Sequence, residues 1–216
     1  MLHPASPPGR EAIVAADGVE LPGVLGVPQR AVGAVVFAHG SGSSRSSSRN
    51  VRVAKQLQDA HLATFLFDLL TPEEASDHRN VFDIPLLARR LASATARLRS
   101  DDEVGALPVG FFGASTGAAA ALWAAVEDPQ IRAVVSRGGR PDLARNLLGS
   151  VRAPTLLIVG GLDPVVLDVN DEARLYMHCD CELRLVPGAT HLFEEPGTLE
   201  IVARLARDWF LKHLPR

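Results

Sequence analysis

The stretch VGFFGASTGAAAALWAA, residues 109–125, changes character around a single serine. Bulky apolar residues precede Ser115, an alanine-rich run follows it, and Gly113 and Gly117 flank it. The apolar run favours a buried strand and the alanine run a helix. G-x-S-x-G at a strand-to-helix turn is the pattern of a nucleophile elbow, in which the serine is held in a strained conformation. Ser115 is therefore a candidate nucleophile, and a glycine-flanked helix cap is the alternative.

The rest of the chain alternates in the same way between short apolar runs and amphipathic segments. A hairpin is expected at 11–28 around Asp17-Gly18. Further strands are expected at 33–40, 63–70, 107–113, 131–139, 153–163 and 181–191. Helices are expected at 48–62, 83–100, 115–128, 140–150, 166–179 and 197–214, and a rim loop at 67–78. This alternation predicts an α/β fold: a twisted, mostly parallel sheet of about seven or eight strands, the first ones antiparallel, with helices on both faces.

Composition is that of an ordinary globular protein. The 216 residues are 47% hydrophobic and 22% charged, and the net charge of −3 provides no bulk attraction for nucleic acid or an anionic membrane. We expect a tail over residues 1–10 and a single domain over 11–216. No signal peptide or membrane helix is predicted. Cys179 and Cys181 fit neither a disulfide framework nor a zinc site, so we expect reduced thiols, a cytoplasmic location and no metal.

A nucleophilic serine needs a histidine as base, and three histidines follow Ser115. His191 is the one expected in a loop just beyond a strand, in VPGATHLFEEPG. His178 is expected near a helix end and His213 inside the last helix. His191 is therefore the candidate base, and a loop-capping histidine is the alternative.

The histidine in turn needs an orienting acid, which in this pattern lies between the serine and the histidine in the chain. Asp163 follows a strand and a Gly-Gly turn, in LLIVGGLDPVV. Asp168 and Asp171 are rivals, but both are expected on the solvent side of the next helix. A simple helix N-cap, with Pro164 in the first turn, is the other interpretation of Asp163.

Two backbone N–H groups should stabilise the oxyanion that forms during acyl transfer. One is expected from Thr116, the residue after the nucleophile. The other is expected from the glycine-rich loop HGSGSS, at Ser41, with Gly42 as the alternative. His39 in the same stretch is expected to brace this loop and not to act as a second base.

The motifs HGSG, GASTG, GGLDPV and GATHLFEEPG together resemble the α/β-hydrolase superfamily, in particular its small, lidless branch that is similar to dienelactone hydrolases. The resemblance covers about residues 11–214 and implies the α/β-hydrolase fold without a large lid domain. Similar domains occur alone and fused to phosphoribosyltransferase domains. The resemblance implies a catalytic triad of Ser115, Asp163 and His191, with Ser41 and Thr116 as oxyanion donors.

The sequence departs from dienelactone hydrolases at two positions. Those enzymes use a cysteine nucleophile and place a glutamate after the histidine of the oxyanion loop, where this chain has Ser115 and Gly40. The resemblance therefore implies a serine esterase that hydrolyses small carboxylic esters without a cofactor. A thioesterase, peptidase or acyltransferase on the same triad is the alternative, as is a non-catalytic ligand receptor. The expected partner is a small-molecule ester, and the chain is expected to be a monomer or homodimer.

Arginines lie close to these motifs in the sequence. Arg137 and Arg140 follow a strand, and Arg45 and Arg49 lie beside the oxyanion loop. Because arginine binds carboxylates and phosphates bidentately, Arg137, Arg140 and Arg45 are candidates for holding an acidic group of the substrate. The alternative is that these arginines pair with surface carboxylates, for which the candidates are Glu73, Glu74, Asp142 and Glu194.

Overall fold

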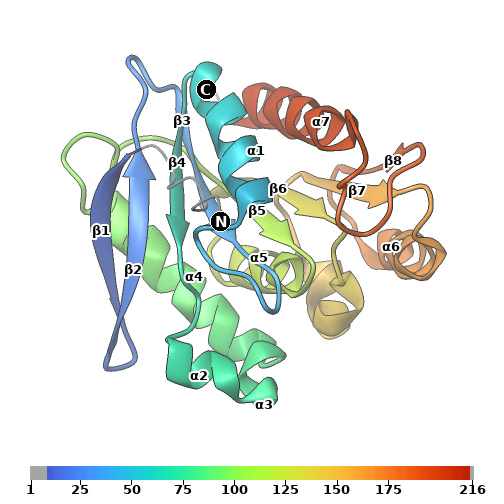
Figure 1. The fold of residues 1–216 in the computed structure, drawn as a ribbon, viewed down its shortest axis with the longest axis horizontal. Helices are drawn as coiled ribbons and strands as arrows, with labels where there is room; N and C mark the ends of the chain where they lie inside the picture. Colours follow the sequence, from blue (N-terminus) through green and yellow to red (C-terminus); the bar gives the residue numbers. More distant parts are fainter. Residues whose placement is uncertain (1–8, 215–216) are drawn as a thin grey trace.

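The structure, a computed structural model, describes residues 9–214 and is built around an eight-stranded sheet (Figure 1). The strands are β1 (Arg10–Ala16), β2 (Val19–Gly26), β3 (Gly33–Ala38), β4 (Leu62–Phe67), β5 (Val109–Ala114), β6 (Ile131–Arg137), β7 (Thr155–Gly160) and β8 (Cys181–Val186). Their order is β1-β2-β4-β3-β5-β6-β7-β8. β2 runs antiparallel to β1 and β4, and the other neighbouring pairs are parallel. The expected mostly parallel sheet with antiparallel first strands is confirmed.

The β1–β2 hairpin turns where the sequence predicts. Asp17 and Gly18 both have positive φ, 48° and 80°, as a two-residue turn between antiparallel strands requires. Residues 1–8 of the expected tail lie outside the described residues. Arg10, expected in the tail, already pairs with Leu25, so the first strand begins one residue earlier than predicted.

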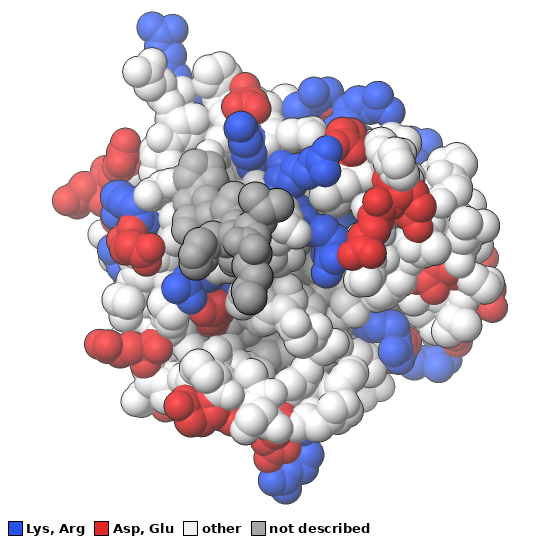
Figure 2. Space-filling model, viewed as in Figure 1, with Lys and Arg blue, Asp and Glu red and all other residues white. Residues whose placement is uncertain are grey.

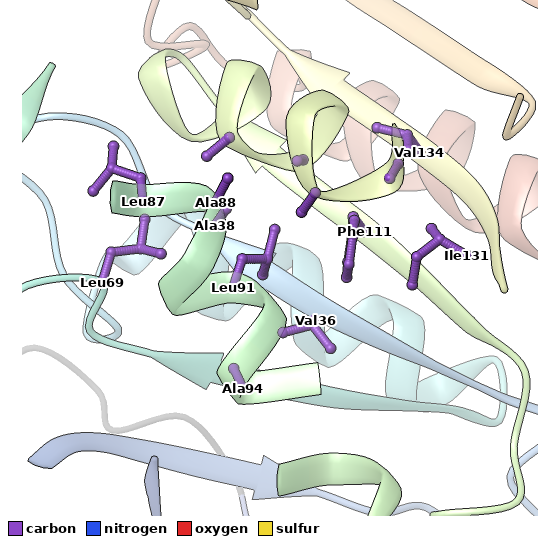
Figure 3. Close-up of a cluster of buried hydrophobic side chains, with 14 of the residues drawn as sticks. Val36, Ala38, Leu69, Leu87, Ala88, Leu91, Ala94, Phe111, Ile131 and Val134 are labelled. Carbon is purple, nitrogen blue, oxygen red and sulfur yellow. The ribbon is translucent and has the colours of Figure 1, made fainter. Parts of the chain in front are cut away.

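Helices cover both faces of the sheet (Figure 1). They are α1 (Ser48–Asp59), α2 (Pro72–Ser76), α3 (His78–Val81), α4 (Ile84–Arg99), α5 (Thr116–Glu127), the 3-10 helix η1 (Pro141–Ser150), α6 (Pro164–Tyr176) and α7 (Thr198–His213). α1 and α7 bury one apolar cluster against the sheet, and α4, α5 and α6 bury another on the opposite face. Figure 3 shows Leu91 of α4 beside Val36 of β3, and Leu87 of α4 beside Leu69. Within residues 9–214, no helix has both the length and the apolar character needed to span a bilayer.

The alanine run lets α5 lie directly against the sheet. A Cβ atom on Gly117 would lie 2.2 Å from the carbonyl oxygen of Ala38, and one on Gly113 would lie 2.4 Å from the Cα of Ala118. These distances leave no room for a side chain, so both glycines are required by close backbone approach. The packing fixes the start of α5, and with it Ser115, at the carboxyl end of the sheet, where open α/β sheets bind ligands.

The segment expected to be a rim loop at 67–78 instead contains α2 and leads into α3. Thr71 and Glu74 form a capping box: each side chain accepts a hydrogen bond from the backbone N–H of the other. Arg90 of α4, which is 2% exposed, binds Glu74 at 2.7 Å and ties α2 to α4. The T-x-x-E spacing was the sequence signal for this helix, and the polar composition of the segment obscured it.

Candidate active site

Ser115 forms the turn between β5 and α5 in the conformation of a nucleophile elbow. Its φ of 51° and ψ of −119° are rare for a residue with a side chain and store backbone strain. The surroundings hold this conformation on both sides, because the Ser115 N–H donates to the carbonyl of Arg137 at 3.1 Å and its carbonyl accepts from the N–H of Arg140 at 3.2 Å. The serine is thereby attached to the end of β6.

Asp163 and His191 are brought together although 28 residues separate them. Asp163 ends the turn after β7, and its Oδ2 lies 2.7 Å from Nδ1 of His191 in the loop after β8. The other oxygen, Oδ1, accepts from the N–H of Val166 at 3.4 Å and caps α6. The two interpretations of Asp163 are therefore both present in the structure, one on each carboxylate oxygen.

The ring of His191 lies over Gly138, between the two residues that bind the backbone of Ser115. A Cβ atom on Gly138 would lie 3.4 Å from Cε1 and 3.5 Å from Nδ1 of His191. Because Nδ1 faces Asp163, Nε2 is the nitrogen left to accept a proton from a hydroxyl. This arrangement brings the candidate serine, acid and histidine to one edge of the sheet.

The loop that carries His191 is fixed by Glu195, a residue that the sequence analysis did not single out. Its Oε1 accepts from the backbone N–H of Thr190 at 3.1 Å and from the Thr190 hydroxyl at 2.5 Å. The Thr190 hydroxyl holds the pKa of Glu195 below its ordinary value. The bond crosses an irregular loop, so no periodic signal in the sequence predicts it.

The predicted oxyanion donors face one cavity. Gly40 to Ser43 form a tight turn, closed by the N–H of Ser43 on the carbonyl of Gly40 at 3.3 Å, with Gly42 at φ 65°. Thr116 is the first residue of α5, where backbone N–H groups have no partner within the helix. Ser41, Gly42 and Thr116 all line a cavity of about 230 Å³. The structure leaves Ser41 and Gly42 both open as the second donor.

The remainder of this cavity is mainly apolar. Side chains from the end of β4 and from α2, α3 and α4 form its walls, namely Leu69, Leu70, Pro72, Ala75, Val81 and Leu87. His39, Asp68 and Thr71 add polar groups. An apolar cavity that begins at two candidate oxyanion donors is suited to hold a small uncharged group next to a reacting carbonyl.

His39 joins the oxyanion loop to the cavity wall, as the expectation of a bracing residue requires. The N–H of Leu69 donates to its Nε2 at 3.0 Å, so its Nδ1 carries the proton and donates to the carbonyl of Gly40, also at 3.0 Å. Burial lowers the pKa of His39, because the charged form loses its hydration. If Nε2 of His39 carried the proton instead, its N–H would point at the N–H of Leu69, and neither donor would have an acceptor.

This geometry predicts a pH-dependent loss of stability. The pKa of His39 is lower in the folded state than its ordinary value of 6.5. The contribution of neutral His39 to the free energy of unfolding is therefore complete above pH 6.5, and it is lost as the pH falls from 6.5 through the pKa of the folded state. We expect the Tm of the wild type to fall more steeply between pH 6.5 and 5 than that of His39→Asn, whose amide can donate to Gly40 but does not titrate. Thermal unfolding followed by circular dichroism measures both slopes, and parallel slopes would contradict the assignment.

Most of the arginines near the site are neutralised by carboxylates. Arg140 binds Asp142 at 2.6 Å and 2.8 Å, Arg49 binds Glu194 at 2.7 Å, and Arg45 pairs with Asp68. Asp68, just after β4, is therefore the counter-ion of Arg45, and its Oδ1 also accepts from the backbone N–H of Arg45 at 2.6 Å. Two of the three arginines proposed for substrate binding already have partners: Arg140 pairs with Asp142, as the alternative interpretation held, and Arg45 pairs with Asp68, a carboxylate that this alternative did not include. The third, Arg137, has no carboxylate within salt-bridge distance in the described part of the chain, and it is treated separately below.

The fold and the arrangement at the sheet edge are those of an α/β hydrolase. The sequence model of the dienelactone hydrolase family matches residues 22–210, so the chain belongs to that family. The dienelactone hydrolase from Anabaena variabilis is 52% identical, with a TM-score of 0.92 over 97% of this chain and 100% of that one. Est1E from Butyrivibrio proteoclasticus, at 16% identity and a TM-score of 0.80 over 94% of this chain and 98% of that one, shares the fold.

Curated relatives are also known from Mycobacterium tuberculosis. A protein of strain H37Rv, provisionally named a phosphoribosyl transferase, is 61% identical over 214 residues, which are 97% of this chain and 48% of that protein. The corresponding protein of strain CDC 1551 has the same identity and coverage. The chain thus spans about half the length of the curated relatives it matches.

Proposed function

We propose that this hydrolase cleaves small carboxylic esters through an acyl-enzyme on Ser115. The observation that carries the proposal is the 2.7 Å contact between Asp163 and His191, formed beside a serine in a strained elbow. An acid that orients a histidine next to a serine is the arrangement that activates a hydroxyl for attack, and Asp163 is partly buried in this position. Backbone strain of this kind clusters at functional sites, which supports a role for Ser115 in the site.

In the proposed reaction, Nε2 of His191 takes the proton of Ser115 as the hydroxyl oxygen attacks the ester carbonyl. Asp163 stabilises the imidazolium that results and keeps the proton on Nδ1. The N–H groups of Thr116 and of Ser41 or Gly42 bind the oxyanion. His191 then protonates the leaving alcohol, and water, deprotonated by the same nitrogen, releases the acid from Ser115.

The cavity favours a short acyl group, since about 230 Å³ is below the roughly 300–1,000 Å³ of sites for drug-sized ligands. Ala75 lies on the cavity wall in α2 and is exposed, so a larger side chain there narrows the cavity without filling the core. We expect Ala75→Phe to lower kcat/KM for an octanoyl ester at least about tenfold relative to an acetyl ester. Ser76→Phe, on the same helix and outside the cavity lining, is the matched control. An equal fall for both esters in Ala75→Phe would contradict this use of the cavity.

The activated serine can be tested without knowing the substrate. We expect a fluorophosphonate probe to add once to the wild type, with the adduct on the peptide that contains Ser115, and not to add to Ser115→Ala. Intact mass and peptide mapping measure both. A folded wild type that gives no adduct would overturn the proposal in favour of a ligand receptor. Parallel assays with p-nitrophenyl esters, thioesters and anilides separate an esterase from a thioesterase or peptidase on the same triad.

The transferase name of the curated relatives does not change this proposal. It describes proteins about twice as long as this chain, which covers 48% of them. The family match and the geometry at Ser115 concern the shared half, and they support hydrolysis. Small carboxylic esters are therefore the substrates to test first.

A further inference from the structure

Arg137, the last residue of β6, is a buried cation with no counter-ion among residues 9–214. It is 7% exposed, and its buried Nη1 has no hydrogen-bond partner within that range. No carboxylate from residues 9–214 lies within 4 Å of it. A buried charge is strongly destabilising unless it is paired, so a site of this kind calls for an anion.

A second arginine increases the positive potential at this position. Burial first and the positive charge of Arg49 second together lower the pKa of Arg137 to about 10. Arg137 remains charged at neutral pH. Arg49 binds the exposed Glu194 through Nη1, but its Nε is also buried without a partner. The exposed carboxylate of Glu194 is thus the only negative charge paired with either Arg49 or Arg137 among residues 9–214.

Arg137 is joined directly to the candidate nucleophile through the backbone. The carbonyl of Arg137 accepts the N–H of Ser115 at 3.1 Å. The side chain of Ser136 points to the α5 face, because a Cβ atom on Gly139 would lie 2.0 Å from its Oγ and 2.7 Å from Cβ of Ala118. Side chains alternate along a strand, so Arg137 points to the opposite face, where α1 begins.

An opening exists on that side. A groove of about 270 Å³ runs between the first turn of α1 and the segment after His191. Arg49 lines this groove and Arg137 does not, and the groove also contains Glu194, Glu195 and Glu200, of which Glu200 is paired with Arg52 and Glu195 with Thr190. On the face shown in Figure 2, acidic and basic side chains alternate outside the grey atoms. The unpaired charge is therefore a local feature of this position and not part of a general basic surface.

We propose that Arg137, assisted by Arg49, binds an anionic group, a carboxylate or a phosphate, beside the Ser115 elbow. Where that group is part of the ester, the inference rests on the proposed function and makes the substrate an anionic ester. Where it is a free anion, the site is a regulatory one next to the nucleophile. Arg45 and Arg140 take no part, because Asp68 and Asp142 neutralise them.

The first test is thermal unfolding, which does not depend on catalysis. Sodium phosphate and sodium acetate are titrated at constant ionic strength, on the wild type, Arg137→Met and Arg140→Met. We expect a saturable rise in Tm of several degrees for the wild type and Arg140→Met, and none for Arg137→Met. In anion-poor buffer we expect Arg137→Met to unfold at a higher temperature than the wild type, because the unpaired charge is gone. If Arg137→Met does not fold, Arg137→Lys, which keeps the charge, takes its place and should retain a weaker response.

The second test compares two esters of similar size, mono-p-nitrophenyl glutarate and p-nitrophenyl valerate. We expect Arg137→Met to lower the ratio of kcat/KM for the anionic ester to that for the neutral one about 10- to 100-fold, and Arg140→Met to leave the ratio within about threefold of the wild type. A changed ratio places the anion on the substrate, and a Tm response alone identifies a free anion. A wild type that responds to neither anion and an unchanged ratio in Arg137→Met would overturn the site. Loss of the proposed function is recognised separately, since then no ester is turned over and no probe adduct forms.

Discussion

Ser115→Ala and His191→Ala are each expected to lower kcat for a short-chain ester by about 10⁵- to 10⁶-fold. The alanine at 115 removes the attacking oxygen. The alanine at 191 removes the group that accepts its proton, so the remaining hydroxyl stays protonated at neutral pH. Because the two residues act as one unit, the double variant should lose little more than either single variant. Steady-state kinetics with p-nitrophenyl acetate, beside circular dichroism to confirm folding, measures these losses.

The matched control for the base is His178→Ala. His178 was one of two rival histidines in the sequence, with His213, and it is exposed next to the end of α6. Its removal should leave kcat within about threefold of the wild type. A large loss in His178→Ala, or additive losses in the double variant, would contradict the assignment of His191 as the base.

The fold and the three residues at the sheet edge could be predicted because their signals are local. Buried parallel strands consist of continuous apolar runs, and the G-x-S-x-G turn requires glycines wherever α5 approaches the sheet. Asp163 follows the same logic, since it comes directly after β7 and precedes a proline that suits the first turn of a helix. Each of these patterns occupies fewer than twenty residues.

What could not be predicted depends on side-chain contacts that leave no periodic signal. The sequence could not show that Arg45 pairs with Asp68, 23 positions away, while Arg137 has no carboxylate partner among residues 9–214, because such pairing depends on which loops and strand ends meet in the fold. The brace from Glu195 to Thr190 has no periodic signature. Helix α2 is marginal on its own at five residues, and it depends on Arg90, sixteen positions from Glu74, to hold it.

Asp163→Asn is expected to lower kcat about 10⁴-fold while leaving the protein folded. Asparagine can keep the cap of α6, since its side-chain oxygen can still accept from Val166, so stability should change little. It cannot provide the charge that stabilises the imidazolium. It can also donate to Nδ1 of His191, which moves the ring proton to Nε2 and blocks the nitrogen that must accept from Ser115. The change therefore separates the two roles of this carboxylate.

Asp168→Asn and Asp171→Asn are the controls, because both aspartates lie exposed on the same helix and were the rival acids in the sequence. Each should keep kcat within about threefold of the wild type and should label normally with a fluorophosphonate, whereas Asp163→Asn should label slowly. If Asp163→Asn is fully active, the role of Asp163 is only to cap α6. A lower Tm of Asp163→Asn together with an unchanged kcat at low temperature would lead to the same conclusion, because the aspartate would then stabilise the helix and take no part in the reaction.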